Sequence, residues 1–367
     1  MSSRDAIPEP RAAAEPAIAA GDTGTAVWGS DAWREQALAW FDARLAEHGI
    51  QRSGAAEQPH LCPWATALRA PTSRGVFWLK AAAPGTAFEM RLYRVLSQLA
   101  PERVLSPLAI DEARAWIILP DGGTTLGDST LSDSALSDSA AGDRFVEAFA
   151  RALAEYARLQ HTLAPHADEL VRLGVSDMRA AVMPQRFDEA AREVATHVAR
   201  GASADDRATY ERALALRGAF GEWCRELAQS PISPSLDHND LHPWNIFSSG
   251  EGQRTRFYDW GDSVVAHPFA SLLVALGFVR HQLKVPADDA RVGRVRDAYL
   301  AEFAGLASHA ELVRTAELAC QVAKIARVLT WTRALAALGS EEDAELARAP
   351  LRWFGMLLDP SPVGVGG

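Results

Sequence analysis

Two short polar runs in the sequence carry side chains whose types and spacing suit phosphoryl transfer. The first run, HNDLHPWN, places Asp240 and Asn245 five positions apart, and the second run, RFYDWGDS, carries Asp259. One carboxylate can accept the proton of an attacking hydroxyl, while an amide oxygen and a second carboxylate can hold Mg²⁺ on the phosphates of a nucleotide. The sequence therefore predicts a phosphotransferase site built from these two runs.

Both runs are expected to lie in loops beside short strands. The first run is too polar for the core of a strand, and Pro243 interrupts a helix, so Asp240 is expected in a loop. In the second run, TRFYDW has the β-branched and aromatic residues of a strand, which would deliver Asp259 from its carboxyl end. The remaining elements must bring these two loops together.

The chain before these runs is expected to form a small lobe rich in strands. Residues 31–49 have one apolar stripe and indicate an amphipathic helix, and residues 59–80 read as two strands around a turn at PTSRG. Residues 86–100 favour a helix, and two apolar runs around DEAR at 111–114 indicate a hairpin. The predicted order of this lobe is strand, strand, helix, strand, strand.

The whole chain divides into four segments on this interpretation. Residues 1–29 are expected to be a disordered tail, and residues 30–122 a nucleotide-binding N-terminal lobe. Residues 123–143 are rich in Ser and Asp and indicate a flexible loop. Residues 144–360 are helical almost throughout and would hold the catalytic loop and the acceptor site. A strand-rich lobe followed by a helical lobe is an α+β arrangement, with a cleft between the lobes.

The two runs resemble known kinase signatures. The first run has the spacing of H-R-D-x-x-x-x-N in protein kinases. Both runs resemble the signature of the aminoglycoside phosphotransferase/choline kinase-like family, H-G-D-x-H-x-x-N followed by an I-D-W-G-D-like segment, most closely over residues 236–276. The resemblance implies a two-lobed, protein-kinase-like fold. It also implies an ATP-dependent, or less often GTP-dependent, transfer of the γ-phosphate to a hydroxyl of a small molecule.

The resemblance also implies roles for the residues of the two runs. By position, Asp240 would be the catalytic base, and His238 would brace the catalytic loop. Asn245 and Asp259 would be the Mg²⁺ ligands. Positioning and charge neutralisation would supply most of the rate enhancement of such an enzyme.

The resemblance further implies that the N-terminal lobe binds the nucleotide. Lys80 would contact the α- and β-phosphates, with Glu89 on the following helix as its ionic partner. No G-x-G-x-x-G precedes Lys80, so the phosphate-covering turn is assigned to PWATAL, with Thr66 and backbone amides in place of glycines. The segment WIILPDGG, which includes Leu119 and Asp121, is expected to be the hinge whose backbone pairs with the adenine.

Two other functions fit parts of the same sequence. His238, Asp240 and His242 form H-x-D-x-H, a set of ligands that suits zinc or iron in a metal-dependent hydrolase. That function leaves Asn245 and Lys80 unexplained. A pseudokinase that binds nucleotide without turnover is the second alternative, because the glycine-rich loop is missing.

Composition limits the class of partner. The chain has 367 residues, a formal net charge of −10 and no apolar stretch long enough for a membrane helix. Nucleic acid and membrane partners are therefore not expected. A cytoplasmic location is expected. Three widely spaced cysteines argue against a disulfide framework. A cationic acceptor, such as an aminoglycoside, amino sugar or amino alcohol, suits the charge, and Asp262 and His242 are candidate contacts for it.

Overall fold

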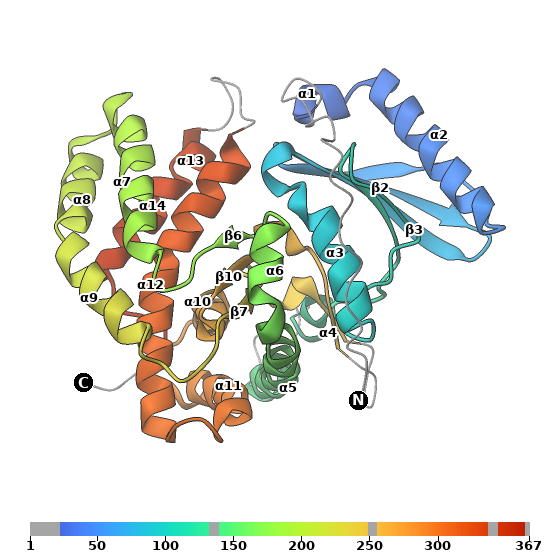
Figure 1. Ribbon diagram of the computed structural model, residues 1–367. Coiled ribbons are helices and arrows are strands. Elements are labelled where there is room, and N and C mark those ends of the chain that lie inside the picture. The colour runs from blue at the N-terminus through green and yellow to red at the C-terminus, as the bar shows by residue number, and fades with distance from the viewer. Residues whose placement is uncertain (1–22, 132–138, 249–254, 337–343, 364–367) are drawn as a thin grey trace, which may run out of the picture.

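The protein consists of two lobes joined at the end of a small sheet (Figure 1). The computed structural model describes residues 23–131, 139–248, 255–336 and 344–363. The N-terminal lobe comprises α1 (Thr25–Trp28), α2 (Asp31–Glu47), β1 (Glu57–Cys62), β2 (Ala65–Thr72), β3 (Gly75–Ala82), α3 (Phe88–Leu99), β4 (Ala109–Asp111) and β5 (Trp116–Pro120). Its strands form one antiparallel sheet in the order β1-β2-β3-β5-β4.

The C-terminal lobe is mostly helical and contains short strands. Its elements are α4 (Leu126–Thr130), α5 (Ser139–Leu163), α6 (Ala167–Arg172), β6 (Ser176–Asp177), α7 (Met183–Ala199), α8 (Ala204–Leu214), α9 (Arg217–Leu227), β7 (Ser235–Asp237), β8 (Ile246–Phe247), β9 (Arg256–Phe257), β10 (Val264–Ala266), α10 (Leu272–Leu283), α11 (Ala290–Leu300), α12 (His309–Leu335), α13 (Ala344–Ala347) and α14 (Ala349–Gly355). The strands form a three-stranded sheet, β6-β10-β7, and a hairpin, β8-β9. The expected α+β, two-lobed architecture is confirmed.

The two faces of the N-terminal sheet pack against different parts of the protein. Alternation along β3 turns Phe77 and Leu79 toward α2, where Phe41, Leu45 and other apolar residues form a separate core. Figure 1 shows α2 lying across this face and α3 on the other side. Lys80 therefore points to the face that carries α3 and the cleft. The α2 helix begins as expected, since the Ser30 side chain accepts a hydrogen bond from the amide of Trp33 at 3.3 Å.

The sheet contains one strand more than the sequence pattern indicated. Residues 59–80 were expected to form two strands, but they contribute to three, because Pro63 and Trp64 make a second turn between β1 and β2. The turn expected at PTSRG lies between β2 and β3, where Gly75 has a positive φ of 99°. The predicted hairpin around DEAR is present as β4 and β5.

The segments expected to lack structure are partly ordered. Most of the tail predicted over residues 1–29 lies outside the described residues, but Thr25–Trp28 forms a helical turn that buries Trp28. The predicted loop over residues 123–143 contains α4 and the start of α5, while residues 132–138 lie outside the described part. Thr125 caps α4, since its side chain accepts a hydrogen bond from the amide of Asp128 at 3.1 Å.

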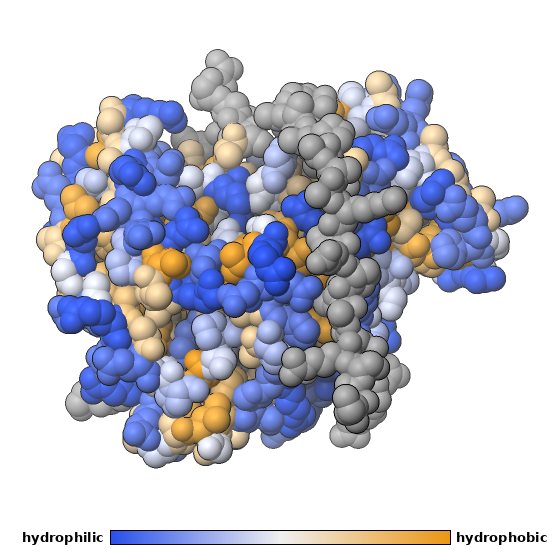
Figure 2. Space-filling model, viewed as in Figure 1, coloured by the Kyte–Doolittle hydropathy of each residue, from blue (hydrophilic) through white to orange (hydrophobic). Residues whose placement is uncertain are grey.

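The face of the molecule shown in Figure 2 carries no large apolar area among the described residues that are visible there. On the side shown in Figure 2, hydrophobic residues occur in small scattered areas among hydrophilic ones. Within the described parts of the chain, no helix combines the length and the apolar character needed to cross a lipid bilayer.

The connection between the lobes depends on a close backbone approach at Gly122. A methyl group added there would lie 2.3–2.4 Å from the ring of Phe247, which is buried against Tyr258. We expect Gly122→Ala to lower the free energy of unfolding by about 1–3 kcal/mol, because the ring must move. Gly221→Ala is the control, since no heavy atom lies within 4 Å of the added carbon and Ala favours the α9 helix. Urea denaturation of both variants checks this, and equal midpoints would contradict it.

Candidate active site

The catalytic loop leaves the C-terminal sheet directly after β7. Asn239 adopts a left-handed conformation with φ of 61°, and its amide donates a hydrogen bond to Asp237 Oδ1 at 2.8 Å. Asn tolerates this conformation better than most residues, which makes the sharp turn possible. The turn leads to Asp240, whose side chain is 31% exposed and lines a cavity between the lobes. The loop predicted from the sequence is therefore present.

Two side chains tie this loop to the second polar run. His238 is buried, and its Nε2–H donates to the carbonyl of Tyr258 at 2.9 Å. The contact links the catalytic loop to the second run, and the bracing role of His238 stays a prediction. Asn245 is also buried, and its Nδ2 donates to the backbone carbonyl of Asp240 at 2.9 Å. These bonds fix the position of the loop on both sides of Asp240.

The spacing between Asn245 and Asp259 follows from a short hairpin. Ile246 of β8 is paired with Phe257 of β9, and the amide of Tyr258 donates to the carbonyl of Asn245 at 3.3 Å. This register places Asn245 beside the end of β9, one residue from Asp259. Asp259 itself adopts a left-handed conformation with φ of 64°, immediately before the short 3₁₀ turn Trp260–Asp262. Backbone strain of this kind is concentrated at functional sites.

Lys80 joins the two lobes through ionic contacts. Its Nζ lies 2.7 Å from Glu89 Oε2 and 2.6 Å from Asp259 Oδ1, so the ion pair predicted with Glu89 is present. Glu89 is fully buried and also accepts a hydrogen bond from the amide of Trp260 at 3.0 Å. Glu89 thereby connects α3 to the turn after Asp259.

The opposite charges of Lys80, Glu89 and Asp259 stabilise one another and oppose the effect of burial. Burial opposes the charge of Lys80, but Asp259 and Glu89 outweigh it and raise the pKa of Lys80. Burial also acts against the charge of Asp259, yet Lys80 keeps the pKa of Asp259 below its ordinary value. For Glu89 burial dominates and raises the pKa. A bound triphosphate would provide a further anionic partner for Lys80, in addition to or in place of these acids.

A cavity of about 430 Å³ lies between the sheet and the β8-β9 hairpin. Leu119, Asp121 and Gly122 of the expected hinge line it, together with Lys80 and Asp259. Asp121 accepts hydrogen bonds from Trp78 Nε1 at 2.9 Å and from the amide of Gly123 at 2.8 Å. The Asp121 side chain therefore orders the hinge, while the backbone of this segment borders the cavity.

Thr66 is not placed where the sequence interpretation put it. Its neighbours Ala65 and Ala67 line the cavity, so alternation along β2 directs Thr66 away from it. Thr66 is buried, its hydroxyl donates to the carbonyl of His60, and it accepts from Gln58 Nε2, both at 2.8 Å. Thr66 holds β1 against β2 and does not line the nucleotide-sized cavity. The covering turn is formed by residues 62–65.

A smaller cavity of about 130 Å³ adjoins the first. Both cavities share Trp64, Ala65, Lys80 and Asp259 in their linings, and the smaller one adds Asp240, Asp262, Arg327, Thr330 and Trp331. Trp64 comes from the N-terminal lobe and Trp331 from α12, and their rings meet edge to face with centroids 5.8 Å apart. His242 does not line this cavity, but its Nε2 lies 3.4 Å from Asp240 Oδ2.

Sequence interpretation did not identify Arg327, although it contacts both acids of the smaller cavity. Its Nη1 donates to Asp262 Oδ2 at 2.9 Å, and its Nη2 lies 3.4 Å from Asp240 Oδ1. Burial acts to raise the pKa of Asp240, but Arg327 and His242 outweigh it and lower that pKa. For Asp262 burial dominates and raises the pKa. No motif surrounds Arg327, so the only signal that could have indicated it is its place among the apolar residues Ile325, Ala326, Val328 and Leu329 in the middle of α12.

The residues present fit Mg²⁺ better than a transition metal. Asn245 uses its Nδ2 in the bond to Asp240, which leaves its amide oxygen as a donor for a cation, and the Asp259 carboxylate is 49% exposed. Oxygen donors are those that Mg²⁺ prefers. In the described ranges, no three His, Cys, Asp or Glu side chains converge as a metal site. His238 donates to Tyr258, so the proposed hydrolase set of His238, Asp240 and His242 is not assembled.

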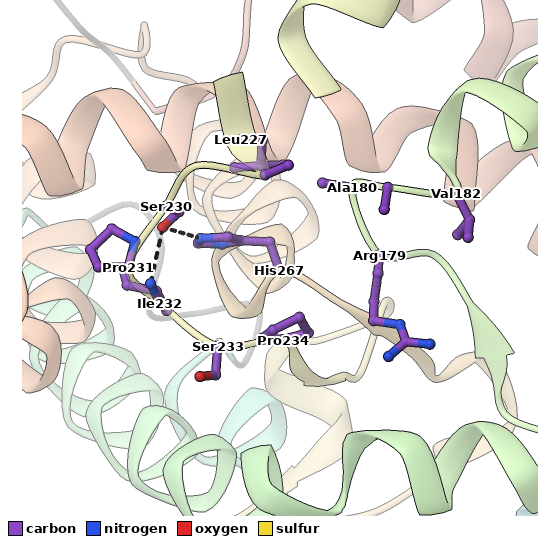
Figure 3. A pocket seen from close by; sticks show the side chains of 12 residues that line it. Arg179, Ala180, Val182, Leu227, Ser230, Pro231, Ile232, Ser233, Pro234 and His267 are labelled. Atoms are coloured by element: carbon purple, nitrogen blue, oxygen red, sulfur yellow. Dashed lines mark hydrogen bonds between the residues drawn. The ribbon is translucent and has the colours of Figure 1, made fainter. Parts of the chain in front are cut away.

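Another cavity of about 420 Å³ lies in the C-terminal lobe between the α7 and α9 ends (Figure 3). His267 accepts a hydrogen bond from the amide of Phe269 and contacts Ser230 Oγ at 3.1 Å. Burial lowers the pKa of His267 to about 3, so its ring is neutral. Arg179 pairs with Asp177 and Asp168. These polar side chains are engaged with protein partners, and we assign the chemistry to the interlobe cavities.

The buried side chain of Asp237 supports the catalytic loop, but its ionised form lowers the stability of the folded protein. It is 1% exposed, its Oδ1 accepts from Ser271 Oγ at 2.6 Å and from the amide of Asn239, and burial raises its pKa to about 6. The protonated carboxyl of Asp237 therefore makes its full contribution to stability below about pH 4. This contribution is lost as the pH rises through about 6 and the group ionises. The shift corresponds to about 3 kcal/mol.

We expect Asp237→Asn to raise the free energy of unfolding at pH 8 by about 1–3 kcal/mol, since an amide oxygen can keep both hydrogen bonds without the buried charge. The advantage should shrink as the pH falls toward about 4. Urea denaturation at pH 5 and pH 8 measures this, with Asp205→Asn as the control at an exposed acid. A pH-independent difference would contradict the prediction.

The two lobes, the Lys80–Glu89–Asp259 cluster and the paired loops define a kinase-like phosphotransferase. The sequence profile of the phosphotransferase enzyme family, APH, matches residues 69–312. The match covers more than half of the chain, so the protein belongs to this family, whose members are small-molecule phosphotransferases. No curated protein sequence gives a significant match.

Solved structures with similar folds come from several small-molecule kinases. An ethanolamine kinase of Plasmodium vivax is 12% identical, with a TM-score of 0.58 over 92% of this chain and 91% of that one. A type I macrolide 2′-phosphotransferase is 16% identical, with a TM-score of 0.51 over 89% and 97%. A spectinomycin phosphotransferase, solved with ADP and spectinomycin, is 12% identical, with a TM-score of 0.50 over 89% and 96%. These similarities confirm the protein-kinase-like fold.

Proposed function

We propose that the protein is an ATP- and Mg²⁺-dependent kinase that transfers the γ-phosphate to a hydroxyl of a small, amine-bearing molecule. The observation that carries this proposal is the meeting of the two interlobe cavities at Lys80 and Asp259, with Asp240 in the wall of the smaller one. The larger cavity suits a nucleotide, and the smaller one suits the acceptor.

Each residue has a role that follows from its position. Lys80, held by Glu89, would neutralise the non-transferred phosphates. Asn245 and Asp259 would hold Mg²⁺, which supplies charge neutralisation to the phosphates when bound. Asp240 would orient the acceptor hydroxyl and accept its proton. The backbone around Leu119 would take the purine.

The charges of the smaller cavity support a cationic acceptor. Asp240, Asp259 and Asp262 carry three negative charges against the two positive charges of Lys80 and Arg327. Trp64 and Trp331 add aromatic walls on which a cation can rest. The volume of about 130 Å³ favours a compact amino alcohol, or one ring of an amino sugar, over a large acceptor that must enter whole. His242 would influence the acceptor site only through its contact with Asp240.

A coupled assay of ADP release tests this proposal. The panel contains amino alcohols, amino sugars, aminoglycosides and matched alcohols without the amine, each with ATP and with GTP. We expect turnover with at least one amine-bearing acceptor and dependence on Mg²⁺. Nucleotide binding by calorimetry without turnover on any acceptor would instead favour a pseudokinase. Equal turnover of the matched alcohols would refute the cationic acceptor but not the kinase.

A further inference from the structure

Helix α12 contributes a buried guanidinium to the point where the two active-site loops meet. The Arg327 side chain is only 5% exposed, and it comes from a different part of the chain than either loop. Its Nη1 donates to the carbonyl of Asn239 and to Asp262 Oδ2, while its Nη2 faces Asp240 Oδ1. One side chain therefore contacts the catalytic loop at two consecutive residues and the second loop at Asp262.

The surroundings hold this guanidinium in one orientation. Its carbon lies 5.2 Å from the ring centroid of Trp353, so the aromatic face supports the planar group. One turn further along α12, Thr330 Oγ1 accepts a hydrogen bond from Asn239 Nδ2 at 2.9 Å, and Asn239 Nδ2 also donates to the carbonyl of Asp262 at 3.1 Å. Asn239 is the left-handed residue that turns the chain toward Asp240. The helix thus contacts the loop at the residue that has the left-handed conformation.

The chemistry of arginine suits this arrangement better than that of lysine. A guanidinium presents several N–H donors in a rigid plane and can serve partners in different directions at once. A lysine at the same position would carry the charge on a single nitrogen and could not reach the Asn239 carbonyl and both carboxylates with fixed geometry. The arrangement therefore depends on the fork of the side chain in addition to its charge.

We propose that Arg327 is a positioning residue for phosphoryl transfer, whose guanidinium sets the distance and orientation of Asp240 relative to Asp262 and to the loop that carries Asp259. This inference rests on the proposed kinase function. It assigns to α12 the task of aligning the acceptor-side carboxylate with the nucleotide side of the site. Small errors in such alignment have large effects on rate.

Arg327→Lys and Arg327→Met test this proposal, and Arg314→Met is the control, since Arg314 lies on the same helix in an exposed pair with Glu226. We expect Arg327→Lys to keep the affinity for Mg·ATP within about twofold and to lower kcat by about 10–100-fold, with little change in KM for the acceptor. Arg327→Met should lose at least as much. Thr330→Val, which removes only the hydroxyl that accepts from Asn239, is a milder variant in case Arg327→Met does not fold.

Hydrogen exchange provides a readout that needs no turnover. In the lysine variant, peptides covering residues 236–247 and 259–263 should exchange at least about tenfold faster than in the wild type, while α2 and the rest of the N-terminal lobe exchange as before. Unchanged exchange in these loops, or a kcat of Arg327→Lys within twofold of the wild type, would overturn the proposal. A parallel loss of nucleotide affinity and global stability would show a merely structural role. Absence of turnover in the wild type would reject the kinase function. In that case the hydrogen-exchange result alone would decide whether Arg327 positions the two loops.

Discussion

Replacement of Asp240 by asparagine is expected to lower phosphoryl transfer by about 10²–10⁴-fold while the affinity for Mg·ATP stays within about twofold. An amide cannot accept the proton of the acceptor hydroxyl, but it has nearly the shape of the carboxylate. The backbone carbonyl of Asp240, which accepts from Asn245, is unaffected by the change. The loop and Asn245, the proposed metal ligand, should therefore keep their positions.

The measurement is kcat with the best acceptor of the panel, together with calorimetry of nucleotide binding. Asp205→Asn serves as the control, because Asp205 is exposed and lines neither interlobe cavity. Undiminished turnover of Asp240→Asn would remove Asp240 from the role of base. Lost nucleotide affinity would show that the loop had moved.

Replacement of Asp259 by asparagine is expected to weaken the binding of Mg·ATP at least about tenfold, or about 1.4 kcal/mol. The variant loses an exposed carboxylate in the position suited to the cation. Metal-free ATP should behave differently, because the change also removes a negative charge beside the phosphates and frees Lys80 from one of its partners. Its affinity is expected to stay equal or to increase.

Calorimetry with ATP in the presence of Mg²⁺ and in the presence of a chelator separates these effects. The decisive quantity is the ratio of the two affinities, which should fall in Asp259→Asn and stay unchanged in the control Asp205→Asn. An unchanged ratio would show that Asp259 does not hold the metal. An equal loss with and without Mg²⁺ would indicate damage to the Lys80 cluster instead.

The parts of the site that are local in sequence could be predicted from it. Asp240 and Asn245 lie on one short loop, and a β-hairpin brings Asp259 beside Asn245, so spacing along the chain translates directly into proximity. Lys80 and Glu89 lie on a strand and the next helix, and their ion pair was also anticipated. Composition and pattern likewise indicated the strand-rich and helical lobes.

The parts that depend on tertiary contacts were missed or misplaced. Arg327 reaches the site from a long helix without a motif, and nothing in its neighbours along the chain marks it. Thr66 was misplaced because the turn assigned to PWATAL is confined to Pro63 and Trp64, whereas Thr66 already belongs to β2, and the face on which a strand residue lies depends on the register of the strand. The helix α4 was overlooked because Ser, Thr and Asp favour both loops and helix starts.

The edge-to-face contact of Trp64 and Trp331 has a thermodynamic consequence. Trp64 belongs to the hairpin that covers the larger cavity, and it also borders the smaller one. Any ligand that shifts Trp64 from one side alters the space available on the other side. Because linkage is reciprocal, an acceptor that tightens the hold on nucleotide must itself be held more tightly, by the same factor, once nucleotide is present. Cooperative loading of the two substrates would then be a property of this single indole.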